Sequence, residues 1–227
     1  RYLHQSADDF EQGRWVTQMA RLASTEHAAD WVINADADEF WWPETGDLKT
    51  TIAACGDCDA IVAQRTNFPP RAPLPSGFFA DVQTLRHTNS VNALGQPLPG
   101  KVAHRAYANV EVIQGNHAII GDGHVLPTVP APLTILHFPM RSYPQFANKI
   151  AKGGAAYQSN RNLPAETGKT WRELFDIWRR AELEQYFTSQ VVDSTLASAM
   201  LASGELVHDG RLKSWLEEMR GRPPAHG

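Results

Sequence analysis

Hydrophobic positions fall into two regimes, with strand-like runs up to about residue 138 and helical spacing after it. One helical stripe precedes the strands, because apolar side chains recur at gaps of three to five within residues 8–25. The apolar run Trp31–Ile33 then predicts a strand. Further strands are expected at residues 59–64, 82–87, 102–113 (interrupted near Ala106) and 133–138. The Pro- and Gly-rich residues 68–79 predict irregular structure, and residues 121–123 predict a turn.

The second half of the chain carries helix signals. Ser142 and Gln145 have the spacing of a capping box, with Phe146 and Ile150 on one face of the helix that follows. The glycine pair at residues 153–154 predicts its end.

Two more helices are expected after it. Thr170 and Glu173 form a second such box. The apolar positions expected to follow it are Leu174, Ile177, Trp178 and Ala181. A last helix starts near Arg211 and carries Leu212, Trp215, Leu216 and Met219. The order of elements predicts an α/β fold, a mixed sheet flanked by helices over residues 1–140 and a helical subdomain over residues 141–227.

An acidic cluster follows the first strand, as the sequence Asn-Ala-Asp-Ala-Asp-Glu-Phe-Trp-Trp. Asp36 and Asp38 are two residues apart, so a strand would place them on one face and a loop could converge them further. Facing carboxylates repel each other unless a cation or a proton lies between them, and Mg²⁺ and Mn²⁺ prefer such oxygen ligands. A solvated acidic turn is the alternative. Trp41 and Trp42, which follow, are candidates either for a ligand site or for the core.

Other polar residues concentrate near predicted strand ends. Lys101 and Arg105 would share one strand face, which suits a diphosphate or simply an exposed surface. His117 follows a glycine-containing bend and is a candidate base, a ligand or a satisfied turn residue. His137 ends the last strand, where it is a candidate ligand or a core histidine. The helix start that follows, which is near Arg141 and Lys149, favours an anion.

Composition narrows the class of protein. The chain has 227 residues, 42% hydrophobic and 20% charged, with a net charge of −4, so it lacks the basic footprint of a nucleic-acid-binding protein. No apolar run is long enough to span a bilayer. Cys55 and Cys58 cannot complete a zinc site alone. They are either a redox pair or, as we favour, incidental thiols in a turn, which indicates reducing conditions. A cytoplasmic location is expected, with peripheral membrane association left open.

Taken as a series, these segments resemble the glycosyltransferase family 2-like proteins of the GT-A fold. They are most similar to the subgroup with an Asp-x-Asp-Glu-Phe signature that is related to glycosyltransferase family 92. The resemblance covers roughly residues 10–171. Its matching pieces are residues 31–40, Lys101, Arg105, His117, His137, Phe138, residues 141–146, Lys149 and Gly153.

The resemblance implies a metal-dependent, inverting transfer of a sugar from a nucleotide-sugar donor to a saccharide or glycoconjugate acceptor. Mn²⁺ or Mg²⁺ would be held by Asp38, with Asp36 and His137 as further ligands. Donor phosphates or ribose would contact Asp36, Lys101, Arg105, Arg141 and Lys149. Glu39 and His117 are candidates for the general base on the acceptor hydroxyl.

One departure from the family and two alternatives accompany this reading. A GT-A domain starts with a strand–helix–strand unit that binds the nucleoside, and too few residues precede the first predicted helix to build it. Because the chain opens with Arg1, a truncated enzyme is expected. The alternatives are a non-catalytic carbohydrate-binding remnant and an Asp-x-Asp phosphatase. The phosphatase motif normally has Thr or Val where this chain has Phe40.

Overall fold

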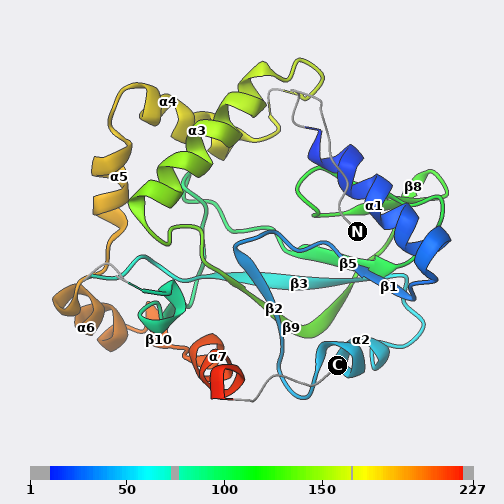
Figure 1. Cartoon of the computed structure of the whole chain (residues 1–227), viewed down its shortest axis with the longest axis horizontal. Coiled ribbons are helices and arrows are strands. Elements are labelled where there is room, and N and C mark those ends of the chain that lie inside the picture. Colours follow the sequence, from blue (N-terminus) through cyan, green and yellow to red (C-terminus); the bar gives the residue numbers. More distant parts are fainter. Residues whose placement is uncertain (1–10, 73–76, 165, 222–227) are drawn as a thin grey trace.

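The computed structural model describes residues 11–72, 77–164 and 166–221. It has a mixed α/β architecture with a curled sheet and helices on both faces (Figure 1). The helices are α1 (Gln12–His27), α2 (Leu48–Ala53), α3 (Tyr143–Ser159), α4 (Lys169–Arg179), α5 (Leu183–Gln190), α6 (Ser194–Ala202), α7 (Arg211–Gly221) and the 3₁₀ turn η1 (Phe79–Asp81). The strands are β1 (Trp31–Ile33), β2 (Glu39–Pro43), β3 (Ala60–Asn67), β4 (Leu85–His87), β5 (Lys101–Arg105), β6 (Glu111–Val112), β7 (Ile119–Gly121), β8 (His124–Val125), β9 (Val129–His137) and β10 (Leu206–His208).

The main sheet has five strands in the order β1-β5-β3-β9-β2. Only β3 and β9 run parallel, and every other neighbouring pair is antiparallel. The register between β3 and β9 shifts opposite Val62 and Gln64, where β9 carries Pro130 and Pro132. Proline has no N–H for a ladder bond, so an irregularity at this point is expected. The strands β1 and β2, consecutive in sequence, therefore lie at opposite edges of the sheet.

Alternating side chains give each face of this sheet its own core. On one face, Ile61, Ala103 and Ile135 pack with Ile52 of α2. On the other face, Val102 packs under α1. Further along that second face, Leu136 and Phe138 pack with Leu212 of α7. The sheet is thus covered on both sides, and the polar side chains that concern us lie at its end.

A separate hydrophobic cluster joins the helices that follow the sheet. Phe146 and Ile150 of α3 pack with Phe175 of α4 and Phe187 of α5. Figure 1 shows these three helices grouped at one end of the sheet, away from α2. They form a helical layer that meets the sheet near the ends of its strands.

Several predicted elements are confirmed, and some boundaries are wrong. The predicted strand at residues 82–87 is confined to β4, because the residues before it form a 3₁₀ turn and a loop. The predicted helix over residues 8–25 is α1, while residues 8–10 lie outside the described part. The short β2, α2 and β10 were missed, and β10 of the second half pairs with β4 of the first.

The predicted helix stop at Gly153 and Gly154 is wrong, since α3 continues to Ser159. These glycines serve packing: a Cβ on Gly153 would lie 2.4 Å from the Trp171 ring, and one on Gly154 would lie 2.4 Å from Cβ of Phe175. Ser142 does cap α3, accepting from the Gln145 N–H.

The second predicted capping box is also wrong. Gly168 stands at the N-cap of α4, so Thr170 lies inside the helix. Ala181 lies beyond its end, in the left-handed region. Trp178, Trp215 and Met219, predicted on apolar faces, are substantially exposed. In the described part of the chain, no helix is both long and apolar enough to cross a bilayer.

Candidate active site

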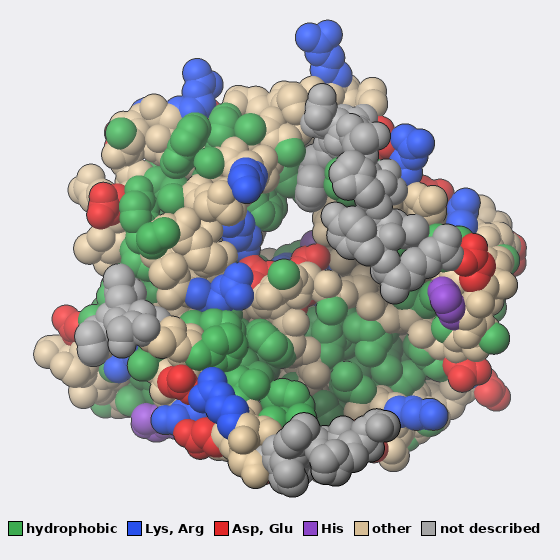
Figure 2. All heavy atoms as spheres, in the orientation of Figure 1, with side chains coloured by type: hydrophobic (Ala, Val, Ile, Leu, Met, Phe, Trp, Pro, Cys, Tyr) green, Lys and Arg blue, Asp and Glu red, His purple; other side chains and the backbone are tan. Residues whose placement is uncertain are grey.

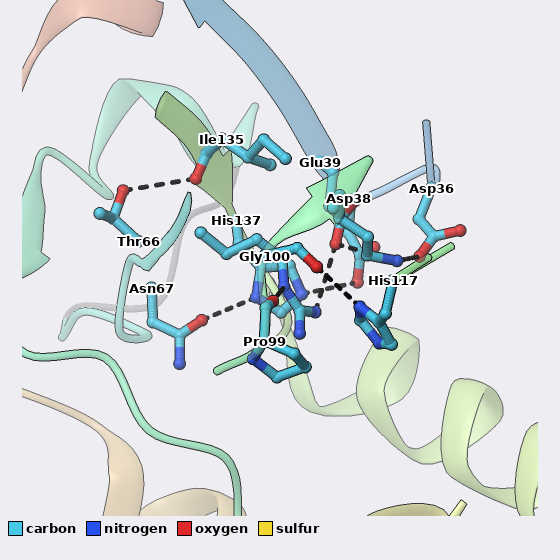
Figure 3. A network of polar contacts seen from close by, with 12 residues as sticks. Asp36, Asp38, Glu39, Thr66, Asn67, Pro99, Gly100, His117, Ile135 and His137 are labelled. Carbon is cyan, nitrogen blue, oxygen red and sulfur yellow. Dashed lines mark hydrogen bonds and ion pairs between the residues drawn. The ribbon is translucent and has the colours of Figure 1, made fainter. Parts of the chain in front are cut away.

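The polar cluster lies where one end of the main sheet meets the helical layer. Glu39 and Lys101 are the first residues of β2 and β5, and Asn67 and His137 are the last residues of β3 and β9. Antiparallel pairing sets Glu39 opposite His137, and parallel pairing sets Asn67 beside His137. The sheet topology thus gathers side chains from four strands at one place (Figure 3).

The acidic loop crosses this end of the sheet. It joins the edge strands β1 and β2, so residues 34–38 pass over the ends of the strands between them. A backbone bond of 3.0 Å from Glu39 N–H to the Asp36 carbonyl closes a turn. The Phe138 N–H donates to the Asp38 carbonyl at 2.9 Å, which ties the loop to β9. Asp36 therefore lies toward β5 and Asp38 toward β9.

The two aspartates have different partners. Asp36 accepts from Lys101 Nζ at 2.6 Å and from Gln12 Nε2 at 3.2 Å. Asp38 accepts from Lys149 of α3. No set of three or more His, Cys, Asp and Glu side chains converges as a ready metal site within the described ranges. In the structure each aspartate is paired with its own lysine, and joint binding of one ion by Asp36 and Asp38 stays a prediction.

Glu39 lies under the loop in a buried ionic network. Its side chain is only 1% exposed, with Oε1 3.5 Å from Lys101 Nζ and 3.4 Å from Arg65 Nη1. Its other oxygen, Oε2, is buried without a hydrogen-bond partner. Burial raises the pKa of the Glu39 carboxyl, an effect that Lys101 and Arg65 oppose. An acceptor hydroxyl cannot reach this carboxylate in the structure.

Asp38 and His137 form the second half of the cluster. His137 Nε2 lies 3.7 Å from Asp38 Oδ2, while His137 Nδ1 is 2.7 Å from Asn67 Oδ1. Burial lowers the pKa of His137 to about 3, so the ring is neutral near pH 7. Because the Asn67 oxygen can only accept, the ring proton lies on Nδ1, and Nε2 presents its lone pair toward Asp38.

Electrostatics keep Asp38 ionised. Burial raises the pKa of its carboxyl, but the Lys149 ammonium, which is paired with it, outweighs this effect and holds the pKa below its usual range. Lys149 also lies over the Trp171 ring, 5.4 Å from its centroid. Asp38 and His137 are therefore two electron-pair donors with a lysine cation beside them.

His117 lies next to this network, on the loop before β7. Its Nδ1 lies 2.8 Å from the Gly100 carbonyl, which assigns the proton to Nδ1 and leaves Nε2 as an acceptor. Burial lowers the pKa of His117 to about 4, with Lys101 and Arg65 contributing. The neutral ring is therefore the form present near pH 7.

Two predicted phosphate-binding residues, Arg105 and Arg141, contact aromatic rings outside the cluster. Arg105 ends β5, roughly 13 Å along the strand from Lys101. Its guanidinium donates to the carbonyls of Gly56 and Cys58 and lies over the Trp31 ring. Arg141 lies over the Phe79 ring, and its Nε is buried without a partner.

The cluster as a whole is balanced in charge. Three carboxylates (Asp36, Asp38, Glu39) are matched by three cations (Arg65, Lys101, Lys149), and both histidines are neutral. A space-filling view shows a hollow with acidic and basic side chains at its margin (Figure 2). A pocket of about 240 Å³ between α1 and β1 has Asp36 at its rim. Asp36 is 33% exposed and is accessible to a ligand.

The sequence reading missed four contributors: Gln12, Arg65, Asn67 and Trp171. Arg65 and Asn67 fall just beyond the predicted strand, which was ended at residue 64, whereas β3 continues to Asn67. A charged residue directly after a buried strand was a usable signal. The tryptophans after the acidic motif belong to the core, since Trp41 is buried on one face and Trp42 packs on the other.

Comparison with protein-family models finds no match to this chain. No curated protein is similar enough to match it. No solved structure matches it either. The resemblance to family 2-like glycosyltransferases therefore depends on the residues of the cluster itself.

Proposed function

We propose that this protein is a glycosyltransferase that moves a sugar from a nucleotide-sugar donor to a hydroxyl of a saccharide or glycoconjugate acceptor, with inversion and with the help of Mn²⁺ or Mg²⁺. The observation that carries the proposal is the pair formed by the Asp38 carboxylate and the Nε2 lone pair of His137. The pair lies at a strand end beside an accessible lysine. A diphosphate bridged by a divalent ion would be matched by this combination of charges.

The residues present fit such an ion. Mg²⁺ and Mn²⁺ commonly take only one or two protein ligands and complete their coordination with phosphate oxygens and water. Asp38 and His137 would supply those two ligands, and Asn67 fixes the His137 tautomer as a second-shell partner does in metal sites. An imidazole ligand favours Mn²⁺ over the harder Mg²⁺. When bound, the ion neutralises the charge that develops on the leaving nucleoside diphosphate.

The cations divide into two roles in this proposal. The Lys149 side chain is 26% exposed, so it can contact the donor diphosphate directly. Lys101 is buried between Asp36 and Glu39 and positions them rather than contacting phosphate. Asp36, at the pocket rim, contacts the donor. Arg105 has no role here because of its distance from the cluster.

The two residues expected as general base differ in access to an acceptor. Glu39 is enclosed by Arg65 and Lys101, so it acts as a positioning residue. His117 retains an unprotonated Nε2 and is the better candidate. Its low pKa makes it a modest base, because a base works best when its pKa is near the working pH.

Binding of a panel of nucleotide sugars, measured by isothermal titration calorimetry with and without Mn²⁺, tests this function. Mn²⁺-dependent binding that Asp38→Asn removes supports it, with the exposed Asp57→Asn as a matched control. Binding of saccharides that is indifferent to metal, without nucleotide-sugar binding, would identify the carbohydrate-binding alternative instead. The phosphatase alternative has less support, since Asp36 follows an edge strand whose neighbour β5 is antiparallel.

A further inference from the structure

The position between Asp38 and His137 is attractive for a cation. Both groups present electron pairs, and their nearest polar atoms are 3.7 Å apart. The lone pair on Nε2 is fixed there because Nδ1–H is held by Asn67. In the structure the cation beside Asp38 is the ammonium of Lys149. The lysine thus competes for the carboxylate that a divalent ion would use.

The Lys149 side chain is 26% exposed, so its ammonium can move away from Asp38. It extends from α3, whose buried side chains pack against α4 and α5. The apolar contacts of α3 are made by side chains other than Lys149, so they would not be lost if the lysine moved. The ammonium lies 5.4 Å from the centroid of the Trp171 ring while it is paired with Asp38, so this favourable contact does not depend on the carboxylate alone.

Charge balance determines when a divalent ion can favourably replace the Lys149 ammonium beside Asp38. The cluster of Asp36, Asp38, Glu39, Arg65, Lys101 and Lys149 sums to zero. A doubly charged cation alone would leave this partly buried site with excess positive charge, and a doubly charged diphosphate diester alone would leave excess negative charge. Unpaired charge in a buried site is costly, whereas adding both ligands preserves neutrality.

We infer that Lys149 couples the two ligands: it holds Asp38 in the absence of ligand and transfers to the diphosphate when a divalent ion takes its place, so that ion and diphosphate bind cooperatively. This inference rests on the proposed function. It assigns Lys149 a gating role besides phosphate contact. By linkage, the factor by which the diphosphate tightens ion binding equals the factor by which the ion tightens diphosphate binding.

The first probe is Mn²⁺ alone, and its binding is measured from the electron paramagnetic resonance signal of the free ion. Lys149→Met removes the competing charge, and Lys149→Gln removes it while keeping a hydrogen-bond donor for Asp38. Both variants should bind Mn²⁺ at least about tenfold more tightly than the wild-type protein. Lys152→Gln, on an exposed position of the same helix, is the matched control and should change nothing. Circular dichroism verifies that each variant is folded.

Dimethyl diphosphate is the second probe, since it carries the doubly charged diester without a base or a sugar. It should tighten Mn²⁺ binding to the wild-type protein and tighten binding to the Lys149 variants much less. If removing Lys149 leaves Mn²⁺ affinity unchanged while Asp38→Asn abolishes it, the coupling is wrong and the proposed metal site stands. If neither the wild-type protein nor any variant binds Mn²⁺, with or without the diester, both proposals fail.

Discussion

Glu39 and His137 are direct partners in the antiparallel ladder between β2 and β9, and this pairing brings His137 to Asp38. The residue before Glu39 is carried to the end of β9, where the Phe138 N–H binds its carbonyl. A register slip of one residue would turn His137 to the opposite face of the sheet. The geometry of the site is therefore a property of strand pairing.

Replacing Asp38 tests the core of the functional proposal. Asp38→Asn keeps the shape of the side chain but removes the charge that attracts a divalent ion. We expect Mn²⁺ affinity and Mn²⁺-dependent transfer to fall by at least about 100-fold. Loss of a direct ligand should cost at least as much as the largest effects of replacing residues that only orient metal ligands. The unfolding temperature should change little. Full activity in this variant, without any metal requirement, would contradict the assignment.

Asn67 fixes the tautomer of His137, so its loss should weaken metal binding without touching a ligand. Asn67→Ala is expected to lower Mn²⁺ affinity about 10- to 100-fold. Titration of Mn²⁺ against the variant measures this. Thr66→Val, which removes the neighbouring 3.4 Å bond to the Ile135 carbonyl, is the control and should retain wild-type affinity. Equal effects of the two changes would indicate a general loosening of β3.

Arg65 compensates a carboxylate that is almost completely buried. Arg65→Met leaves Glu39 with Lys101 alone and should lower the free energy of unfolding by about 3–5 kcal/mol. Glu39→Gln in the same chain should restore much of that loss, because it removes the uncompensated charge. Urea denaturation of both single variants and the double variant gives the coupling energy. Additive effects would show that the two side chains do not interact.

His117 makes stability depend on pH. Its pKa is about 4 in the folded protein and near 6.5 when unfolded, so the unfolded chain binds a proton first as pH falls. The stabilising contribution is complete above pH 6.5 and is lost as pH falls from 6.5 toward 4, on the order of 1 kcal/mol per pH unit. Urea denaturation at pH 7 and pH 5 should show a smaller difference in His117→Gln than in the wild-type protein.

Close packing of α3 against α4 depends on Gly154. A methyl group there would lie 2.4 Å from Cβ of Phe175, an atom that cannot rotate away. Gly154→Ala should therefore destabilise the protein by about 1–3 kcal/mol. Gly210→Ala, where nothing lies within 4 Å, is the matched control in thermal unfolding. Identical melting temperatures for the two variants would refute this view of the helix contact.

Sequence reasoning located the strands of the site because each has a buried apolar run: the predictions at residues 59–64 and 133–138 are found in β3 and β9. It failed at Gly153 and Gly154, where contact with α4 compensates for the weak helix propensity of glycine. Local signals cannot report such a contact.

The arrangement of the cluster was only partly predictable. Asp36, Asp38, Glu39, Lys101, His137 and Lys149 do meet at one end of the sheet. Asp36 and Asp38 pair with different lysines because β1 and β2 lie at opposite edges of the sheet. The spacing of residues in the sequence does not show this order of strands. The sequence also placed Arg105 with Lys101 because they share a strand face, although one strand length separates them.

The acidic loop also limits how far apart the two edge strands of the sheet can lie. The five residues of the loop span four strand-to-strand intervals, about 19 Å if the sheet were flat. The turn closed by the Glu39 N–H shortens the distance that these residues can cover. Loop length and sheet curvature are therefore set jointly. Deleting one loop residue would bring the two sheet edges closer together or detach an edge strand. Inserting one residue would reduce the curvature of the sheet and allow Asp36 and Asp38 to move away from their lysine partners.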